Sequence, residues 1–377
     1  MERIRLTPRA DWRERAQMLG FDFAEIDGQP YWDESACWRF SADEIDCLDD
    51  ATAELHRLCL AAADFAVRND RRLMLGISDA AWKLVVHSWE RQEPSLYGRM
   101  DLRWDGTGAP KLLEYNADTP TALFEASVVQ WEWLTSLYPE ADQFNSIHEA
   151  LLAAWPKIIG PERLHLVCQR NSAEDRGTVA YLRDTATQCG IDARFLFMDE
   201  VGWDGRRFVD LDNLEIQTAF KLYPWDWLVR DPFGAHISST GMKWIEPAWR
   251  MLLAGKGLLA ILWELFPDHP NLLPAFLQPG RIAGPEIAKP LWGREGANIS
   301  APGWTTSGPY SDGGFVHQQW AELPCVDGRY AVIGSWLIAG VPRGIGIRED
   351  ATPITRDTSR FVPHYFDPRP PDGDPQP

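Results

Sequence analysis

Four polar residues on two neighbouring segments could together hold a metal ion and an anion: Arg99, Asp101, Glu114 and Asn116. Polar and apolar residues alternate in both segments, which predicts two half-buried strands, and the Gly-containing linker 105–110 predicts a hairpin. A hairpin without a bulge places Asp101 opposite Glu114 and Arg99 opposite Asn116. Facing carboxylates repel unless a cation or proton lies between them. With the amide oxygen they form an all-oxygen ligand set suited to Mg²⁺, and a solvated polar face is the inert alternative.

The same alternation assigns the apolar side chains of the hairpin. Met100, Leu102 and Trp104 are expected to face the core, on the side opposite Asp101. On the second strand, an unbroken alternation places Leu112 on the face that carries Glu114. The hairpin is therefore predicted to be amphipathic along its whole length.

Helices must cover the hairpin before and after it. The sequence predicts them over residues 9–20, 41–70, 78–93, 119–137 and 143–157. Thr119 followed by Pro120 has the pattern of an N-cap and a first helical residue. Asp118, Thr119 and Thr121 are therefore expected at a helix N-terminus, where backbone N–H groups favour an anion.

A change of pattern after residue 160 predicts a βαβ unit with a parallel sheet. The apolar strand 164–168 is followed by a helix over 175–189 and an extended segment over 192–198. The loop 169–175, which contains Glu174 and Asp175, lies at the carboxyl end of the first strand. That end often receives substrate, although an ordinary capped helix start explains the same residues.

Two stretches carry lysines beside glycines. Lys289 is expected on a strand that leads into a Gly-rich loop with Arg294 and Gly296, whose free N–H groups can close over phosphates. Lys256 interrupts an apolar helix over 249–263. It is not part of a Walker-type phosphate loop, because Arg250 stands where the first glycine is required. Further strands are predicted over 314–321, 330–337 and 344–348.

Composition limits the class of partner. The 377 residues carry a formal net charge of −18, which argues against a nucleic-acid or anionic membrane surface. No apolar run reaches the ~18 residues that a membrane span needs. The six cysteines show no metal-binding spacing and are expected to be reduced thiols of a cytoplasmic protein.

The motif Arg99-x-Asp101 followed by Glu114-Tyr-Asn116-Ala-Asp118 resembles the metal and phosphate motif of the glutathionylspermidine synthase family. The resemblance implies a mixed α+β / α/β, ATP-grasp-like synthetase with an inserted βαβ lobe. It covers residues 1–366, with lobes of roughly 1–160, 161–215 and 216–366, before a disordered Pro-rich tail over 367–377. We expect a short stand-alone member that lacks the family's amidase domain.

The resemblance also implies ligands and roles. ATP and Mg²⁺ would be bound, and the substrates would be a glutathione-like acid and a polyamine-like amine. Thr119, Thr121 and Asp175 replace the residues expected from the family, so the two substrates could differ. By this resemblance Arg99 is catalytic; Asp101, Glu114 and Asn116 bind the metal; Lys256, Lys289, Arg294, Gly296, Gln318, Gln319, Trp320, Ala321 and Arg348 bind ATP; and Asp118, Thr119, Thr121, Glu174 and Asp175 bind substrate.

The leading hypothesis is therefore an ATP-dependent ligase that forms an amide bond. A non-catalytic relative that only binds nucleotide or peptide is the first alternative, but it predicts loss of a metal ligand or of Lys289, and neither is lost. A hydrolase that uses Asp101 and Glu114 as an acid–base pair is the second. It leaves Lys289 and the Gly-rich loop without a role.

Overall fold

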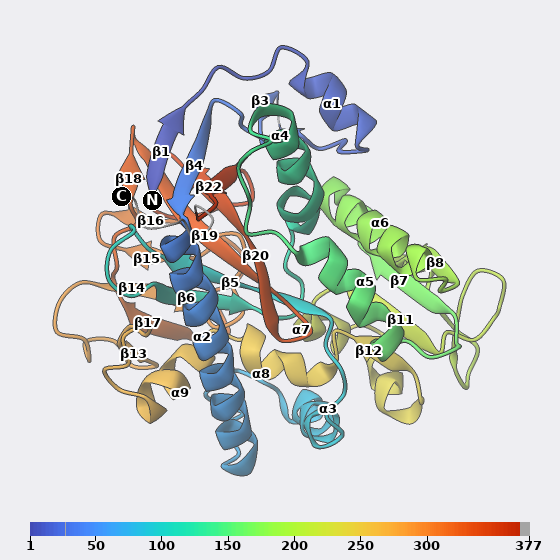
Figure 1. The fold of residues 1–377 in the computed structure, drawn as a ribbon. Helices are drawn as coiled ribbons and strands as arrows, with labels where there is room; N and C mark the ends of the chain where they lie inside the picture. Colours follow the sequence, from blue (N-terminus) through green and yellow to red (C-terminus); the bar gives the residue numbers. More distant parts are fainter. Residues whose placement is uncertain (27, 370–377) are drawn as a thin grey trace, which may run out of the picture.

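The computed structural model describes residues 1–26 and 28–369 and shows a mixed α/β protein (Figure 1). Its three largest sheets are one of six strands, one of five and a parallel one of four. These sheets bring together segments that are far apart in the sequence. The mixed α/β class predicted from the sequence is confirmed.

The six-stranded sheet contains the predicted hairpin. Strand β5 pairs with β6 on one side and with β19 on the other, so the hairpin joins an antiparallel sheet formed by the C-terminal part of the chain. The strands are β5 (Tyr97–Arg103), β6 (Lys111–Asn116), β18 (Cys325–Val326), β19 (Arg329–Ile338), β20 (Val341–Asp350) and β21 (Arg360–Val362). The predicted lobes 1–160 and 216–366 therefore share one sheet.

The register of the hairpin places the four polar residues as expected, up to a bulge. Asp101 lies opposite Glu114 and Arg99 opposite Asn116, but beyond Asp101 the register shifts, and Leu102 faces Leu112. The bulge turns Leu112 into the core, where its side chain is fully buried. The predicted position of Leu112 on the polar face was wrong, because one extra residue reverses the alternation.

The second antiparallel sheet carries Lys289. Its strands are β13 (Ala275–Phe276), β14 (Glu286–Pro290), β15 (Ser300–Ala301), β16 (Trp304–Thr305) and β17 (Phe315–Gln319). Lys289 is the fourth residue of β14 and lies opposite Val316 of β17. The Gly-rich loop follows β14 directly and folds back as the short β15–β16 ribbon, so a strand does deliver this lysine.

The parallel sheet confirms the predicted βαβ unit and extends it. Its strands, in spatial order, are β12 (Lys243–Ile245), β11 (Thr218–Leu222), β7 (Leu164–Cys168) and β8 (Ala193–Phe197). Helix α6 (Ala173–Gln188) connects β7 to β8 and covers the sheet (Figure 1). Because β11 and β12 come after residue 215, the predicted lobe 161–215 includes only half of this sheet.

Helices pack around these sheets. Ser41 forms a reciprocal capping box with Glu44 at the start of α2. Helix α2 packs against α8 and α9 beside the six-stranded sheet (Figure 1). The helices are α1 (Trp12–Met18), α2 (Ala42–Arg68), α3 (Asp79–Glu90), α4 (Gln130–Leu137), α5 (Ile147–Ile158), α6, α7 (Trp225–Leu228), α8 (Met251–Ala254) and α9 (Leu258–Leu265), with 3₁₀ turns at Met198–Glu200, Gly234–Ser239 and Ala248–Arg250.

The helix predicted from residue 119 begins later than expected. Helical structure starts at Leu123 and runs through a π-helical turn, Glu125–Val129, into α4. The carbonyl groups of Pro120 and Thr121 accept hydrogen bonds from side chains of β5. Ala122 adopts a positive φ of 67°. This part of the chain is therefore an extended segment, and the expectation of a helix N-terminus at Asp118–Thr121 was wrong.

Helix α5 also begins four residues later than predicted. Asp142 and Asn145 form isolated bridges with Phe366 and Gly344, which hold the residues before α5 in extended form. The last described strand lies beside the N-terminal strands: β22 (His364–Asp367) is parallel to β4 (Ala36–Ser41), which pairs with β1 (Glu2–Arg5). Asp367, predicted to open the disordered tail, belongs to β22, and residues 370–377 of that tail lie outside the described residues.

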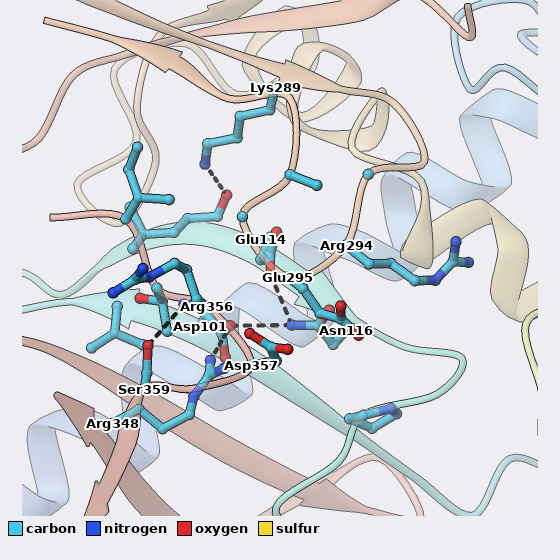
Figure 2. Close-up of a pocket in the computed structure, with 18 of the residues that line it drawn as sticks. Asp101, Glu114, Asn116, Lys289, Arg294, Glu295, Arg348, Arg356, Asp357 and Ser359 are labelled. Atoms are coloured by element: carbon cyan, nitrogen blue, oxygen red, sulfur yellow. Dashed lines mark hydrogen bonds and ion pairs between the residues drawn. The ribbon is translucent and has the colours of Figure 1, made fainter. Parts of the chain in front are cut away.

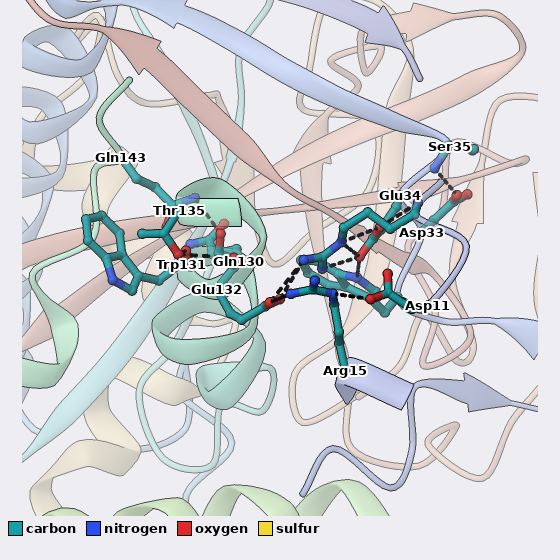
Figure 3. Close-up of polar contacts among 12 residues, drawn as sticks. Asp11, Arg15, Asp33, Glu34, Ser35, Gln130, Trp131, Glu132, Thr135 and Gln143 are labelled. Carbon is teal, nitrogen blue, oxygen red and sulfur yellow. Dashed lines mark hydrogen bonds and ion pairs between the residues drawn. The ribbon is translucent and has the colours of Figure 1, made fainter. Parts of the chain in front are cut away.

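A partly buried ion network fixes the N-terminal segment to α4 (Figure 3). Arg9 binds Glu34 at 2.6 Å and Glu132 at 2.9 Å, and Arg15 binds Glu132 at 2.7 Å. This network holds the segment around Tyr31, which follows the short ribbon β2 (Glu25–Ile26) and β3 (Gln29–Pro30). A second ribbon, β9 (Gly202–Trp203) and β10 (Phe208–Val209), lies after β8.

Within residues 1–26 and 28–369, every cysteine is a free thiol. Over the same residues, the structure contains no helix with the length and apolar character to cross a membrane.

Candidate active site

A cavity of about 330 Å³ is lined by parts of all three large sheets. Its lining includes seventeen of the eighteen residues singled out from the sequence, although these come from segments that are up to 249 positions apart. They are Arg99, Asp101, Glu114, Asn116, Thr119, Thr121, Glu174, Asp175, Lys256, Lys289, Arg294, Gly296, Gln318, Gln319, Trp320, Ala321 and Arg348.

Asp101 is the buried centre of the hairpin face (Figure 2). Its Oδ1 accepts a hydrogen bond of 2.7 Å from Nε of Arg99, and its Oδ2 accepts one of 2.6 Å from Nη2 of Arg348. Arg99 also donates from Nη1 to the carbonyl oxygen of Thr121 at 2.7 Å. Two guanidinium groups from adjacent parts of the sheet therefore converge on one carboxylate.

Glu114 and Asn116 lie beside this group on β6. The Asn116 amide donates to Oδ2 of Asp101 at 3.2 Å and to Oε1 of Glu114 at 3.1 Å (Figure 2). Lys256 lies 3.0 Å from Oε2 of Glu114. Burial alone would raise the pKa of Glu114, but the charges of Lys256 and Lys289 lower it well below its ordinary value. Glu114 is therefore held as an anion at neutral pH.

The arrangement fits Mg²⁺. Among the described residues no three His, Cys, Asp or Glu side chains group closely enough to form a metal cage. Mg²⁺ needs no such cage, because it commonly uses one or two carboxylates and completes its shell with waters and substrate phosphates. Asp101 and Glu114 provide two facing carboxylates, and Asn116 reaches both of them. Rotation of its amide would present an oxygen in place of the nitrogen.

Lys289 connects the five-stranded sheet to the hairpin. Its Nζ donates to the carbonyl oxygen of Leu113 at 3.0 Å and to Oε1 of Gln318 at 2.8 Å. Leu113 is the bulge residue, so its carbonyl is free of the strand ladder and available to the lysine. Burial lowers the pKa of Lys289 to about 8, although Glu114 opposes this change. The ammonium group is therefore fixed at the cavity wall beside the carboxylates.

The Gly-rich loop bends over the cavity and contacts the strand connection opposite it. Arg294 forms an ion pair with Asp226 of α7, and its guanidinium lies 5.1 Å from the ring centre of Trp227. Gly296 has a φ of 67°, and a Cβ there would lie 2.7 Å from the carbonyl oxygen of Thr355. Only glycine fits this contact without moving the backbone.

Gln318, Gln319, Trp320 and Ala321 line the cavity from the end of β17. The N–H of Gln319 donates to Pro274 at 2.8 Å, and that of Trp320 donates to Pro285 at 2.9 Å. These two N–H groups are therefore not free to donate to a purine bound at this edge. The backbone carbonyl groups and the N–H of Ala321 remain for hydrogen bonds to such a base. Gln318 has a structural partner as well, because its amide donates to the carbonyl of Leu112 at 3.0 Å.

The opposite wall is acidic. Glu174 and Asp175 lie in the first turn of α6, and Thr121 lines the same cavity. Burial raises the pKa of Glu174, and Arg99 and Arg348 reduce this rise. Burial and the charge of Glu174 raise the pKa of Asp175 to about 7. No ion pair joins either carboxylate to a cation within the described part of the chain.

Comparison with known proteins assigns the family. The model of the glutathionylspermidine synthase pre-ATP-grasp family matches residues 3–367. The chain belongs to the glutathionylspermidine synthase family. A protein of Haemophilus influenzae named "Putative acid--amine ligase" is 40% identical, over 98% of this chain and 100% of that protein. The family predicted from the sequence is confirmed.

Larger relatives share this synthetase region. The bifunctional glutathionylspermidine synthetase/amidase of Escherichia coli is 28% identical over 83% of this chain and 56% of that protein. The trypanothione synthetase of Crithidia fasciculata is 27% identical over 82% and 53%. The chain thus spans about half the length of these two relatives. A solved glutathione synthetase-like effector of Globodera pallida has the same fold, with a TM-score of 0.56, 11% identity and coverage of 94% and 96%.

Asp118 is the one predicted site residue that does not line the cavity of this glutathionylspermidine synthase family member. Its Oδ1 binds Nζ of Lys221 at 2.5 Å, and its Oδ2 accepts the N–H of Trp225 at 2.8 Å. Both partners lie in or after β11, and both side chains are fully buried. Asp118 therefore joins the hairpin to the parallel sheet, and its predicted contact with substrate stays a prediction that this placement does not support. Lys221, a charge inside an apolar strand, was the signal for such a partner.

Sequence reasoning also missed several lining residues. Tyr31 enters the cavity from the N-terminal segment, and Trp227 and Glu295 enter beside Arg294. The connection from β20 to β21 contributes a further group, in which Asp350 binds Arg356 at 2.9 Å and Ser359 at 2.7 Å. The polar run over residues 355–360 could have indicated this wall. Tyr31 left no signal, because it lies in an ordinary apolar stretch.

Proposed function

We propose that this chain is an ATP- and Mg²⁺-dependent ligase that joins a glutathione-like peptide to a polyamine-like amine through an acyl phosphate. The observation that carries the proposal is one cavity in which the facing carboxylates of Asp101 and Glu114 are surrounded by cations from three other segments. The named relatives, which are ligases and synthetases, support the acid–amine ligase class.

The chemistry requires such a cavity because a carboxylate is a poor electrophile. Transfer of the γ-phosphoryl group of ATP to the carboxylate of the acid gives a mixed anhydride and ADP. The amine nitrogen then forms a bond to the carbonyl carbon, the bond to phosphate breaks, and a proton leaves the nitrogen. Phosphoryl transfer is accelerated mainly by positioning and by stabilising charge on the transferring group.

The wall of the cavity built from the antiparallel sheets, where each carboxylate is paired with a cation, suits these tasks, and we call it the paired wall. Asp101, Glu114 and Asn116 would hold Mg²⁺, which neutralises phosphate charge when it is bound. Lys289 and Lys256, fixed near Glu114, would contact the phosphates as point charges. Arg99 has a planar guanidinium already oriented by Asp101 and by the Thr121 carbonyl, so it can stabilise charge that develops on the transferring group or on the carbonyl oxygen.

The acidic wall supports the choice of an amine. Glu174 and Asp175 are unpaired carboxylates at the opposite side of the cavity, and an ammonium group would compensate both. The printed names of the relatives include glutathionylspermidine and trypanothione, which supports a peptide acid and a polyamine. The acid would then bind between the two walls, next to Thr119 and Thr121.

A coupled assay of ADP release tests the proposal. Acids that include glutathione and γ-glutamylcysteine are combined with spermidine, spermine or putrescine, and each acid is also tested with hydroxylamine, which traps acyl phosphates as hydroxamates. ADP release that needs both acid and amine, and hydroxamate that needs acid, ATP and Mg²⁺, are the expected results. Tight ATP binding without ADP release from any pair would overturn the ligase and favour a binding protein.

A further inference from the structure

A buried carboxylate behind the acidic wall has no role in the chemistry described so far. Glu125 is fully buried in the π-helical turn Glu125–Val129. Its Oε1 accepts a hydrogen bond of 2.7 Å from the Tyr31 hydroxyl, whereas Oε2 has no hydrogen-bond partner among the described residues. A buried polar atom without a partner is costly, so its presence calls for an explanation.

Tyr31 links this carboxylate to the cavity. Tyr31 lines the cavity together with Thr121 and Glu174, whereas Glu125 lies behind it. The Tyr31 ring packs against Phe21 and Phe23, with centroid distances of 6.3 and 6.0 Å, so the hydroxyl is held in place. A group in the cavity therefore reaches Glu125 through the oxygen of Tyr31.

The charges around the pair suit a proton acceptor. Burial and the charge of Glu174 on α6 raise the pKa of Glu125 to about 8, while the Tyr31 hydrogen bond and Arg99 of β5 oppose this rise. Burial and Glu125 hold the pKa of Tyr31 well above its ordinary range, and Arg348 of β20 opposes this. A general base is most effective when its pKa lies near the working pH. Glu125 meets this condition, and Tyr31 stays protonated.

Amide formation needs such an acceptor. An aliphatic amine enters as an ammonium ion, especially beside unpaired carboxylates, and it cannot attack a carbonyl carbon until the nitrogen has lost a proton. Building on the proposed ligase function, we propose that Tyr31 and Glu125 form a relay that takes this proton from the amine substrate. Tyr31 touches the substrate, and Glu125 acts through Tyr31.

The transfer balances in one step. The ammonium N–H bond breaks and its proton moves to the oxygen of Tyr31, while the Tyr31 hydroxyl proton moves to Oε1 of Glu125. The freed electron pair on nitrogen forms the bond to the acyl carbon, and the bond between that carbon and the phosphate oxygen breaks with its electrons staying on the phosphate. The second proton that the nitrogen must lose to give the neutral amide leaves on the departing phosphate. Tyr31 is unchanged at the end, and Glu125 holds the proton until it is returned to solvent after product release.

A purely structural hydrogen bond is the competing explanation, and Glu125→Gln separates the two. The amide oxygen of glutamine still accepts the Tyr31 hydrogen bond, but glutamine cannot take a proton. With glutathione, ATP and Mg²⁺, we expect amide formation with spermidine to fall about 10²-fold in this variant, within the range of lost general-base catalysis. Hydroxamate formation should stay within about twofold, because hydroxylamine is neutral and needs no base.

The pH profile gives a readout that a structural role would not change. Amide formation by the wild type should rise with pH and level off above about pH 8, where Glu125 is ionised. In Glu125→Gln it should continue to rise, because only hydroxide removes the proton. Equal loss of amide and hydroxamate, or an unchanged profile, would overturn the relay.

Two further variants serve as test and control. Tyr31→Phe removes the bridging hydroxyl and should reproduce the selective loss of amide formation. Tyr181→Phe removes another buried hydroxyl that contacts the same π-helical turn, at Ser127, but Tyr181 does not line the cavity. It should leave the ratio of amide to hydroxamate unchanged. An equal change of this ratio in both variants would point to the fold of the turn and would overturn the relay.

A measurement without turnover separates this proposal from the function on which it rests. If the wild type forms neither ADP nor hydroxamate with any acid, the ligase is wrong. Spermidine binding is then followed by calorimetry at pH 7 in buffers of different ionisation enthalpy. A cation beside Tyr31 should expel the proton of Glu125, so the wild type should release more protons per spermidine than Glu125→Gln. Equal proton counts, or no binding of spermidine to the wild type, would overturn the relay.

Discussion

The two walls of the cavity treat charge in opposite ways. On the wall built from the antiparallel sheets, each carboxylate has a cation, as Asp101 has Arg99 and Arg348 and Glu114 has Lys256. On the acidic wall built by α6, no ion pair joins Glu174 or Asp175 to a cation among the described residues, and Glu125 behind this wall accepts a hydrogen bond from the Tyr31 hydroxyl. The first wall lowers the pKa of Glu114, whereas the second raises the pKa of its carboxylates.

This difference shows how one cavity can bind ligands of opposite charge. The paired wall has its cations fixed before any anion arrives, so under the proposed function phosphate groups would replace the carboxylates as partners of these cations with little rearrangement. The acidic wall stays uncompensated until a cation binds, and ligand binding there relieves a cost that the free protein carries. Substitutions on the two walls should therefore change stability in opposite directions.

The largest effect is expected from Asp101→Asn on the paired wall. The change leaves two guanidinium groups without their anion and removes a proposed Mg²⁺ ligand. Breaking a buried ion pair costs about 3–5 kcal/mol in the free energy of unfolding. ADP release should become undetectable at any Mg²⁺ concentration, as measured in the coupled assay, and the unfolding midpoint in urea should fall. Full activity in Mg²⁺-depleted buffer would remove Asp101 from the metal site.

Asp33→Asn is the matched control for this variant. Asp33 is also buried and binds Arg360 at 2.7 Å, but it does not line the cavity. Its loss should lower stability while the turnover of the folded fraction stays intact. A similar loss of turnover in both variants would mean that Asp101 acts only through stability.

Arg99→Lys should have the next largest effect. Lysine keeps the charge but loses the planar fork that contacts Asp101 and the Thr121 carbonyl together. The loss of one oriented donor typically raises the barrier by about 3–4 kcal/mol, or 10²–10³ in kcat. We expect kcat to fall while the Kd for ATP changes little. A lower melting temperature and weaker ATP binding with unchanged kcat would give Arg99 a structural role only.

Gly334→Ala tests the same guanidinium without changing it. Gly334 of β19 lies opposite Asp101, and a Cβ there would approach Cδ of Arg99 to 2.7 Å. Overpacking costs about 1–3 kcal/mol and should displace the arginine, so kcat should fall about 10–10²-fold. Gly241→Ala is the control, because its Cβ would have no atom within 4 Å. Unchanged kcat in Gly334→Ala would show that the position of Arg99 is not critical.

The comparison of walls also separates what the sequence could predict from what it could not. The paired wall could be predicted because alternation along two strands and one turn fixes the strand register locally. This register places Asp101, Glu114 and Asn116 on one face. The bulge at Leu113 could not be predicted, because the composition of the strand does not indicate one extra residue. Its effect is large, since it frees the carbonyl that holds Lys289.

The acidic wall was predicted less well because distant partners shape it. Local signals favoured a helix from Thr119, yet Tyr97 and Arg99 take the carbonyl groups of Pro120 and Thr121 from more than twenty residues away. Asp118 likewise binds a residue far away in the sequence, Lys221. Local propensity is a weak prior when such contacts compete with it. Tyr31 and Glu125 are also far apart in the sequence, and the packing of the N-terminal segment against α4 brings them together.

Asp175→Asn on the acidic wall should have the smallest effect, and its sign should be opposite to that of Asp33→Asn. The folded-state pKa of Asp175, about 7, lies above its ordinary value of 3.8. The protonated form is therefore favoured by folding, so its contribution to stability is complete below about pH 4 and is lost as the pH rises to 7. Neutralising the residue should stabilise the protein at pH 8 by about 1–2 kcal/mol, after allowance for screening by solvent in the cavity.

Urea unfolding at several pH values measures this gain. The advantage of Asp175→Asn should shrink between pH 7 and pH 4, because the wild-type carboxyl becomes protonated there. The pKa of Asp33 lies below its ordinary value, because hydrogen bonds from Ser35 and Arg360 outweigh the effect of burial. Asp33→Asn should therefore lower stability at pH 8, and this loss should shrink only at lower pH. Asp175→Asn should also raise the KM for the amine while leaving the KM for ATP unchanged. A loss of stability in Asp175→Asn at pH 8 would mean that this carboxylate already has a partner, and the contrast between the two walls would fail.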